Sequence, residues 1–401
     1  MKVLIINSFY FPDILGGAEI SVKKLAENMA LYNNEVHILC TSSADKTEII
    51  NKVNIHRMKI NNLYHPIQAS EKKGIQKILY RIIDYINLFN YSKVKMKIKE
   101  IKPDVIHTNN LYGISPIVWI VANQLKIPIV HTVRDYNLIN VMNGSHFNKD
   151  NSYLYIINKF HKKIQSCLLK KINCVTGPSK AVLNRHKEVI GQTENLVVYN
   201  SIDFEKEKLL EIQKAKQQKK SQQLNYCFVG TLDHHKGVMD LIKAFELSNL
   251  HNASLHIAGK GPLEQNVLDV AKKNNNIIFH GFLKEEELSR LLLQSDCLIA
   301  PSKWEEPFGR VVLDAYKHLI PVIVSNKGGL PEIVKHMETG LVIEPTVTQI
   351  TNALYQVKEL IKEEKVTQNI ISKIEEFSLN SQTYNFKMLY KKVVKKNEYP
   401  N

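Results

Sequence analysis

The residues best suited to chemistry lie in one stretch of the chain, Pro301 to Ala315. Two of its carboxylates, Glu306 and Asp314, stand eight positions apart, and a helix is expected to begin between them at Gly309. About two helical turns separate them, so both can accept hydrogen bonds from hydroxyl groups of one extended ligand. The backbone amides of residues 308–310 can hold phosphate or sugar oxygens. Two acidic residues are often only solvent-exposed side chains without a binding role. Their place in a glycine-bounded loop at a strand end favours ligand binding here.

A second candidate is the loop from Gly230 to Gly237, which follows an apolar run. Lys236 stands there at a predicted turn between a strand and a helix. An ammonium group flanked by glycines at such a turn is well placed to neutralise a diphosphate. A solvent-exposed lysine of an ordinary turn is the alternative.

Two further glycine loops, Gly16 to Glu19 and Gly259 to Pro262, also lie where a strand is expected to pass into a helix. Glycine lets the backbone approach a ligand closely. A structural turn explains either loop equally well. The second loop is not a Gly-x-Gly-x-x-Gly fingerprint, so it gives no support to nicotinamide binding.

Strand–helix units must position these loops, because open α/β sheets bind ligands beyond the carboxyl ends of their strands. Short apolar runs recur, each followed by a helical pattern, as is typical of parallel strands covered on both faces. The first series is Val3–Asn7, Glu35–Thr41, Asp104–His107, Ile127–Thr132, Asn173–Gly177 and Leu196–Tyr199. The second series is Tyr226–Gly230, Leu255–Gly259, Ile277–Gly281, Cys297–Ala300, Pro321–Val324 and Leu341–Glu344. We therefore predict α/β architecture with two Rossmann-like, doubly wound domains.

The length of 401 residues also favours two domains, since one hydrophobic core rarely organises so long a chain. Between the two strand series, Glu205 to Gln223 is rich in Lys, Gln and Glu and contains no apolar run. We predict an N-terminal domain at 1–200, a linker at 201–223 and a C-terminal domain at 224–380. The tail, 381–401, shows apolar residues at helical spacing.

Composition is that of a soluble globular protein, with 44% hydrophobic and 23% charged residues. The five cysteines are scattered and form no Cys-x-x-Cys pair, which argues against disulfides and zinc and favours a reducing cytosol. No apolar stretch approaches the roughly 20 residues that span a bilayer. We expect a cytoplasmic protein. The net charge of +15 favours anionic partners, but no helix-turn-helix, RRM or zinc-finger signature supports nucleic acid.

One segment, 71–100, combines apolar residues at helical spacing with eight Lys and Arg against three acidic residues. Such a basic amphipathic pattern fits a surface for anionic lipid, which would place the protein peripherally at the inner face of a membrane. A core-packed helix with a solvated outer face is the alternative, and the sequence favours it slightly.

The run from Asp296 to Pro345 resembles the donor-binding core of the family-four retaining glycosyltransferases, also called glycosyl transferases group 1. That family has two glutamates eight positions apart around Pro-Phe-Gly, then Pro-Val, then Gly-Gly-x-Pro-Glu. Here these features are Glu306-Pro307-Phe308-Gly309, Asp314, Pro321-Val322 and Gly328-Gly329-Leu330-Pro331-Glu332. Further landmarks match in order at 16–19, 200–203, 230–237 and 340–342, so the resemblance covers nearly the whole chain.

The resemblance implies the GT-B architecture, in which two Rossmann-like domains face each other across a cleft. The N-terminal domain would bind the acceptor, the C-terminal domain the nucleotide sugar, and the tail helix would return to the N-terminal domain. Glu306 would face the donor sugar, Asp314 the ribose and Lys236 the diphosphate. The remaining donor-binding residues implied by the resemblance are Gly17, Gly230, Thr231, Gly259, Phe308, Gly309, Arg310 and Val311.

Four residues depart from the family pattern, and one of them is Leu319, where a small residue is usual. Asp314 replaces a glutamate, Thr231 stands where arginine is frequent, and Arg134 takes the place of the histidine in a His-Asp pair. Arg134 therefore joins Glu306 and Lys236 as a catalytic candidate that acts on the phosphate electrostatically. Gly16, His107 and Asp135 are candidates for the acceptor site or cleft. A core histidine and a capping aspartate are the alternatives for His107 and Asp135.

The family's mechanism is transfer with retention, in which the acceptor hydroxyl attacks the face from which the diphosphate departs. No metal cluster is visible in the sequence, so we expect a metal-independent hexosyltransferase with a nucleotide-diphosphate sugar as co-substrate and no cofactor. The expected acceptor is a glycan or lipid-linked molecule of bacterial cell-surface polysaccharide synthesis. Two alternatives stay open: a nucleotide-sugar epimerase of the same architecture, and an inactive sugar-nucleotide-binding subunit.

Overall fold

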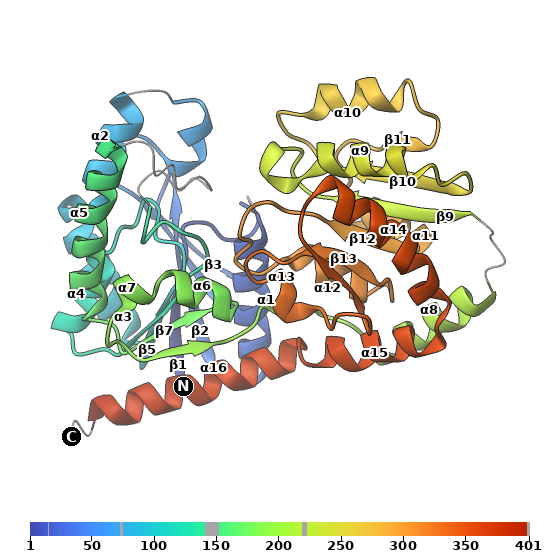
Figure 1. The fold of residues 1–401 in the computed structure, drawn as a ribbon. Coiled ribbons are helices and arrows are strands. Elements are labelled where there is room, and N and C mark those ends of the chain that lie inside the picture. The colour runs from blue at the N-terminus through green and yellow to red at the C-terminus, as the bar shows by residue number, and fades with distance from the viewer. Residues whose placement is uncertain (15, 73–74, 141–151, 219–222, 399–401) are drawn as a thin grey trace. The chain divides into compact units, whose positions relative to one another are not determined.

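The computed structural model describes residues 1–401 apart from 15, 73–74, 141–151, 219–222 and 399–401. The chain forms two compact units (Figure 1). Unit 1 comprises Met1–Tyr199 together with Leu379–Asn401, and unit 2 comprises Asn200–Ser378. The segment predicted as a linker, 201–223, belongs to unit 2 and contains helix α8 (Lys206–Gln218).

Unit 1 is built on an eight-stranded sheet in the order β3-β4-β2-β1-β5-β6-β7-β8. Its strands are β1 (Lys2–Ile6), β2 (Glu35–Ser42), β3 (Lys46–Ile50), β4 (Val53–Lys59), β5 (Val105–Thr108), β6 (Ile129–Thr132), β7 (Cys174–Gly177) and β8 (Asn195–Val197). All neighbours are parallel except β3 with β4. The first predicted strand series is confirmed, since each of its six runs overlaps one of these strands.

The antiparallel pair β3 and β4 was not predicted from the sequence. β3 lies at the edge of the sheet and is largely exposed, so its side chains do not form an apolar run. β4 buries two polar residues, His56 and Arg57. Each has a side-chain partner within the sheet: His56 Nε2 lies 2.9 Å from His37 Nδ1, and Arg57 Nε donates to Glu48 Oε1 at 2.6 Å. These polar pairs interrupt the apolar run that would otherwise identify β4.

Helices cover both faces of this sheet (Figure 1). They are α1 (Gly17–Leu31), α2 (Ile75–Tyr85), α3 (Tyr91–Ile101), α4 (Ile117–Gln124), α5 (Ser152–Leu169), α6 (Lys180–Arg185), α7 (Lys187–Ile190) and α16 (Leu379–Glu398), with short 3₁₀ helices η1 (Pro66–Ser70) and η2 (Leu88–Asn90). The tail helix α16 buries Phe386, Leu389, Tyr390 and Val393 in the same core as α1 and the strands. The Asn28 amide of α1 donates to Thr383 Oγ1 of α16 at 2.8 Å.

The basic segment 71–100 divides into two helices that behave differently. In α3 the apolar side chains Val94, Ile98 and Ile101 are buried, as expected for a core-packed helix. In α2 the buried residues are Tyr80 and Asp84, while Ile75, Ile78, Leu79 and Ile82 are exposed. The core-packed alternative is therefore correct for α3 and wrong for α2.

Unit 2 contains a six-stranded, entirely parallel sheet in the order β11-β10-β9-β12-β13-β14. Its strands are β9 (Leu224–Val229), β10 (Ala253–Ala258), β11 (Ile277–Phe279), β12 (Cys297–Ala300), β13 (Val322–Ser325) and β14 (Gly340–Ile343), which confirms the second series. Its other helices are η3 (His234–Lys236), α9 (Val238–Ser248), α10 (Glu264–Ala271), α11 (Glu285–Gln294), α12 (Arg310–Tyr316), α13 (Leu330–Ile333), α14 (Val347–Lys362) and α15 (Glu364–Glu375). The chain order reverses between β9 and β12, and ligands of doubly wound sheets bind at such a switch point.

Candidate functional site

Lys236 follows β9, the first strand of unit 2, and closes the short helix η3. The backbone of the loop is fixed by local bonds: the Asp233 carboxylate accepts from the His235 amide at 3.3 Å, and the Lys236 amide donates to Asp233 O at 3.0 Å. Gly237 then adopts φ +74°, and a Cβ there would lie 2.3 Å from Pro301 O. The loop after β9 and the loop after β12 therefore pack backbone to backbone, which requires glycine.

Glu306 lies in the loop after β12 and reaches back to the loop after β9. Lys236 Nζ is 2.5 Å from Glu306 Oε1, and Ser302 Oγ donates to the same oxygen at 3.0 Å. Both charged side chains are mostly buried. The structure thus brings together the two residues that the sequence identified as the main candidates, at the switch point of the sheet.

The Gly-Gly-x-Pro-Glu motif holds the backbone of Glu306. The Gly329 amide donates to Glu306 O at 2.7 Å. Gly328 has φ +61°, and a Cβ there would lie 2.2 Å from Glu306 O. The motif therefore fixes the backbone position of the catalytic candidate Glu306. Sequence spacing alone does not reveal this role.

Gly230 and Gly259 bring the loops after β9 and β10 into contact. A Cβ on Gly259, which has φ +147°, would lie 1.8 Å from Gly230 O, and the Gly259 amide donates to Gly281 O at 2.7 Å. These two glycines are necessary for close backbone packing at the strand ends. Thr231 is exposed beside them.

The start of α12 carries the other predicted donor residues. Gly309 has φ +106°, and a Cβ there would meet Leu330 Cδ2 at 2.3 Å. The Phe308 side chain is buried and packs edge-on against Phe377. Arg310 and Val311 are half-buried.

Asp314 lies further along α12 and lines a separate groove of about 960 Å³. Lys284, which precedes α11, and Ser289 and Arg290 within that helix line the same groove. The prediction that Glu306 and Asp314 address different parts of one ligand stays a prediction.

In unit 1, the Gly16–Glu19 loop is organised by its own residues. The Glu19 carboxylate is buried and accepts from the Gly16 amide at 2.8 Å, which caps the start of α1. Gly17 is the first residue of that helix. These contacts are those of a structural turn.

The cleft prediction for His107 is wrong. Its side chain is completely buried, with Nε2 2.7 Å from Thr132 Oγ1 and Nδ1 2.6 Å from the Tyr390 hydroxyl. Burial lowers the pKa of His107 well below its ordinary value. His107 is a neutral core residue that ties β5 and β6 to α16.

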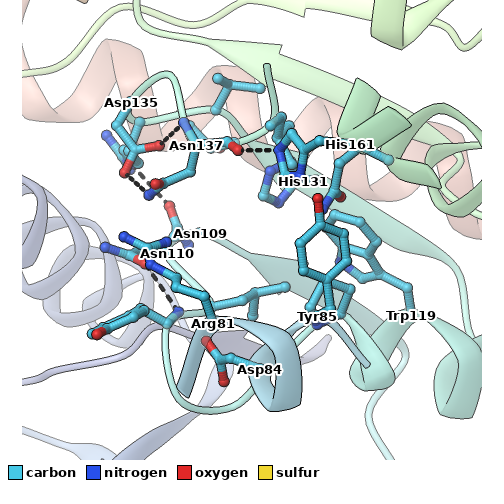
Figure 2. Close-up of a pocket in the computed structure, with 18 residues that line it drawn as sticks. Arg81, Asp84, Tyr85, Asn109, Asn110, Trp119, His131, Asp135, Asn137 and His161 are labelled. Carbon is cyan, nitrogen blue, oxygen red and sulfur yellow. Dashed lines mark hydrogen bonds between the residues drawn. The ribbon is translucent and has the colours of Figure 1, made fainter. Parts of the chain in front are cut away.

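Arg134 and Asp135 follow β6 and line a cavity of about 110 Å³ in unit 1, hereafter the polar pocket (Figure 2). Arg134 Nε donates to Asn109 Oδ1 at 3.0 Å. The Asp135 carboxylate accepts from the amide of Asn137 at 2.9 Å and from its side chain at 2.7 Å. Burial raises the pKa of Asp135. The Asp135 carboxylate therefore stabilises its own loop. Arg134 and Asp135 both line the pocket.

The polar pocket also contains residues that the sequence analysis missed. Arg81, Asp84 and Tyr85 come from α2, while His161 and Gln165 come from α5. Both Asp84 oxygens accept from the Gly113 amide, at 3.1 and 2.9 Å, and burial raises the pKa of Asp84 to about 7. These helices carry no recognisable motif, so only the folded chain identifies the residues.

Four buried polar atoms at the wall of this pocket have no hydrogen-bond partner in the described part of the chain: Asn109 Nδ2, Asn137 Oδ1, His161 Nδ1 and Gln165 Oε1. His161 Nε2 lies 2.6 Å from Asn137 O and must donate to it, which leaves Nδ1 as an acceptor. A hydroxyl group can both donate and accept, so a ligand rich in hydroxyl groups can pair with these three acceptors and one donor. Each buried group left unpaired costs about 1–3 kcal/mol, and pairing with the ligand removes that cost.

Comparison with known proteins agrees with this architecture. A protein of Klebsiella pneumoniae named "Uncharacterized 42.6 kDa protein in cps region" is 28% identical over 344 residues, covering 83% of this chain and 87% of the relative. The structure of sucrose-phosphate synthase from Thermosynechococcus elongatus superimposes with a TM-score of 0.73 at 18% identity and 98% coverage of both chains. Anabaena Alr3699/HepE in complex with UDP-glucose gives a TM-score of 0.67 at 16% identity, covering 98% of this chain and 100% of that one.

Two family models match consecutive parts of the chain. The model described as Glycosyltransferase Family 4 matches residues 15–206, and that described as Glycosyl transferases group 1 matches residues 210–377. The protein belongs to the group 1 glycosyltransferases. It has the two Rossmann-like units of the GT-B fold, and its activity is that of a glycosyltransferase.

Two further features concern the described residues alone. Within them, no three His, Cys, Asp or Glu side chains converge as metal ligands. None of the described helices is both long and apolar enough to cross a membrane.

Proposed function

We propose that the protein is a retaining, metal-independent glycosyltransferase that moves a hexosyl group from a nucleotide-diphosphate sugar to a glycan or lipid-linked acceptor. The observation that carries the proposal is the Lys236–Glu306 pair at the switch point of unit 2. A cation and an anion that meet at the carboxyl ends of β9 and β12 provide one group for a diphosphate and one for sugar hydroxyls.

The chemical difficulty in this reaction is the charge that develops on the departing diphosphate. Preorganised cations and amides stabilise such charge best in a site that excludes water. Lys236 exchanges its contact with Glu306 for the diphosphate, helped by the backbone amides of residues 308–310. Glu306 then accepts hydrogen bonds from hydroxyl groups of the donor sugar. The acceptor hydroxyl attacks the face that the diphosphate leaves, and the diphosphate takes its proton.

The nucleoside occupies the groove lined by Asp314 and α11. A carboxylate accepts two hydrogen bonds from a ribose diol, and the groove volume of about 960 Å³ is that of a nucleotide-sized site. Support for a uridine donor comes from the similarity to Anabaena Alr3699/HepE, which was solved with UDP-glucose.

The acceptor binds in unit 1, with a sugar residue in the polar pocket. Its hydroxyl groups satisfy the unpaired atoms of Asn109, Asn137, His161 and Gln165. Arg134 lines the same pocket, and we assign it the electrostatic role towards the phosphate that the family resemblance implies. A pocket of about 110 Å³ is small beside the roughly 300–1,000 Å³ of drug-sized sites, so it accepts one compact group and not a long glycan.

We place the reaction in cell-surface polysaccharide synthesis, in the cytoplasm at the inner face of the membrane. The Klebsiella relative supports this assignment because its name locates it in a cps region. The net charge of +15 supports an anionic membrane as partner.

Incubation with a panel of nucleotide-diphosphate sugars tests the function. Expected are transfer to a glycan or lipid-linked acceptor, an anomeric configuration in the product equal to that of the donor by NMR, and full activity in EDTA. Epimerised donor without transfer would establish the epimerase instead. Donor binding without any turnover would establish an inactive binding subunit.

A further inference from the structure

The helix α2 presents its apolar stripe to solvent. Ile75, Ile78, Leu79 and Ile82 recur at helical spacing and are 71, 60, 46 and 63% exposed. Tyr80 and Asp84, on the opposite side of the helix, are buried. A surface helix of a soluble protein normally does the reverse. The orientation is fixed, because both Asp84 oxygens accept from the Gly113 amide.

The neighbouring helix α5 has the same character. Tyr85 of α2 and His161 of α5 are in edge contact, with ring centroids 5.1 Å apart, and Figure 1 shows the two helices next to each other in unit 1. Beside the buried His161, α5 exposes Tyr155, Ile156 and Phe160. We call the exposed apolar side chains Ile75, Ile78, Leu79, Ile82, Tyr155, Ile156 and Phe160 the apolar face. Exposed apolar surface on this scale marks a site of association.

The charged side chains of the two helices that carry the apolar face are mainly cationic. The described residues of α2 and α5 include the lysines Lys77, Lys159, Lys162 and Lys163, while Arg81 lines the polar pocket. Asp84 of α2 is buried, and Glu188 of α7 pairs with Lys162 at 2.7 Å. Two copies of the face would bring like charges together. An anionic lipid surface complements them, because Lys and Arg side chains close to a membrane are attracted to its anionic lipids.

We propose that unit 1 docks on an anionic lipid bilayer through the apolar face of α2 and α5. The apolar side chains enter the boundary between head groups and acyl chains, while the lysines contact lipid phosphates. The other side of α2 places Arg81, Asp84 and Tyr85 on the polar pocket, so docking brings that pocket to the depth of lipid head groups. Docking at this depth favours a lipid-linked acceptor over a free glycan, an inference that rests on the proposed function.

Vesicle co-sedimentation tests the docking without any substrate. The protein should bind vesicles of phosphatidylcholine with phosphatidylglycerol and bind phosphatidylcholine alone much more weakly. Raising salt from about 0.1 to about 1 M shortens the Debye length from about 10 to 3 Å and should weaken the binding. Ile78→Asp/Ile82→Asp should weaken it at least about tenfold, because two aliphatic side chains no longer enter the lipid.

A matched control is Leu31→Asp/Ile49→Asp, which alters two equally exposed aliphatic residues of unit 1 on α1 and β3. It should bind anionic vesicles like the unaltered protein. A lack of vesicle binding by the unaltered protein overturns the proposal, as does an α2 variant that binds equally well. Self-association in sedimentation that Ile78→Asp/Ile82→Asp abolishes, without vesicle binding, would establish a dimer interface instead.

Activity separates this proposal from the proposed function. Ile78→Asp/Ile82→Asp should lose transfer to an acceptor embedded in vesicles and retain transfer to a short-chain, water-soluble analogue. It should also bind nucleoside diphosphate normally. If no acceptor is glycosylated by any variant, the proposed function fails while the vesicle result still decides the docking.

Discussion

Lys236 Nζ lies 2.5 Å from Glu306 Oε1 although 70 residues separate the two along the chain. Both side chains are mostly buried, and the Ser302 hydroxyl donates a second hydrogen bond to the same carboxylate oxygen. In this arrangement each charge is compensated before any substrate arrives. Donor binding therefore replaces one anionic partner of Lys236 with another, and Glu306 becomes available to sugar hydroxyls.

Replacing Glu306 by glutamine tests its role as an acceptor of hydrogen bonds. Glu306→Gln keeps the shape of the side chain and removes the charge, so kcat should fall by about 10²-fold or more while the protein stays folded. Steady-state kinetics on the best donor measure this. Glu338→Gln, a carboxylate in an exposed pair with Lys335, is the control and should leave kcat unchanged. Near-native turnover of Glu306→Gln would remove Glu306 from the active site.

Asp314→Ala should weaken nucleotide binding more than it slows the chemical step, since its proposed partner is the ribose. Loss of a charged acceptor for two hydroxyl groups corresponds to roughly 10-fold or more in affinity. Calorimetric titration with nucleoside diphosphate measures the effect, and Asp314→Glu should retain binding. Unchanged affinity in Asp314→Ala would show that the groove beside α11 does not hold the nucleoside.

Most of the fold was predictable from the sequence because buried parallel strands form continuous apolar runs. The exceptions are instructive: β4 buries His56 and Arg57, and their partners His37 and Glu48 are visible only after folding. Spacing identified Lys236 and Glu306 separately. Their contact depends on β9 and β12 being neighbours, which strand lengths and composition do not specify.

The site in unit 1 was less accessible to sequence analysis. His107 has the sequence context of a strand-end residue, but its partner Tyr390 lies 283 residues away and makes it part of the core. Arg81 and His161 reach the polar pocket from helices whose periodicity shows only amphipathic character. Periodicity also left the direction of the α2 stripe undecided, because a stripe facing the core and one facing lipid have the same pattern.

Gly328→Ala should destabilise the protein by about 2 kcal/mol or more, because a Cβ would lie 2.2 Å from Glu306 O at φ +61°. Thermal denaturation measures the loss, and kcat should fall with it as Glu306 moves. Gly281→Ala is a matched control with φ +65° and nothing within 4 Å of the added Cβ. Gly281→Ala should lose less stability, because the left-handed backbone conformation is then the main cost of the substitution. Equal losses would mean that contact with Glu306 is unimportant.

Asp84 should make unit 1 less stable as pH rises. Burial raises its pKa to about 7 in the folded protein, so between about pH 4 and 7 the folded state holds a proton that the unfolded state has released. Asp84→Asn should match the unaltered protein near pH 4 and exceed its stability near pH 8, by up to a few kcal/mol. Asp45→Asn should be less stable than the unaltered protein at neutral pH. The hydrogen bond from Lys93 lowers the pKa of Asp45 and so stabilises its charged form in the folded protein. Parallel melting-temperature curves for Asp84→Asn and the unaltered protein would contradict the assignment.

Lys236→Met tests where the diphosphate binds. Methionine keeps most of the length of the lysine side chain and deletes its charge, so the packing between the loops after β9 and β12 should survive. The charge on the diphosphate grows as the glycosidic bond breaks, so the contact strengthens towards the transition state. We therefore expect kcat to fall by roughly 10²-fold, more than donor affinity falls.

A second substitution and a control complete this test. Lys335→Met removes an exposed lysine of the same unit and should leave both constants unchanged. Thr231 is exposed in the loop of Lys236 and stands where the family often has arginine. Thr231→Arg should therefore restore part of kcat in the Lys236→Met background, because a guanidinium group can supply the missing charge to the phosphates. If Lys236→Met leaves kcat and donor affinity unchanged, the diphosphate binds elsewhere, and the pairing of Lys236 with Glu306 is purely structural.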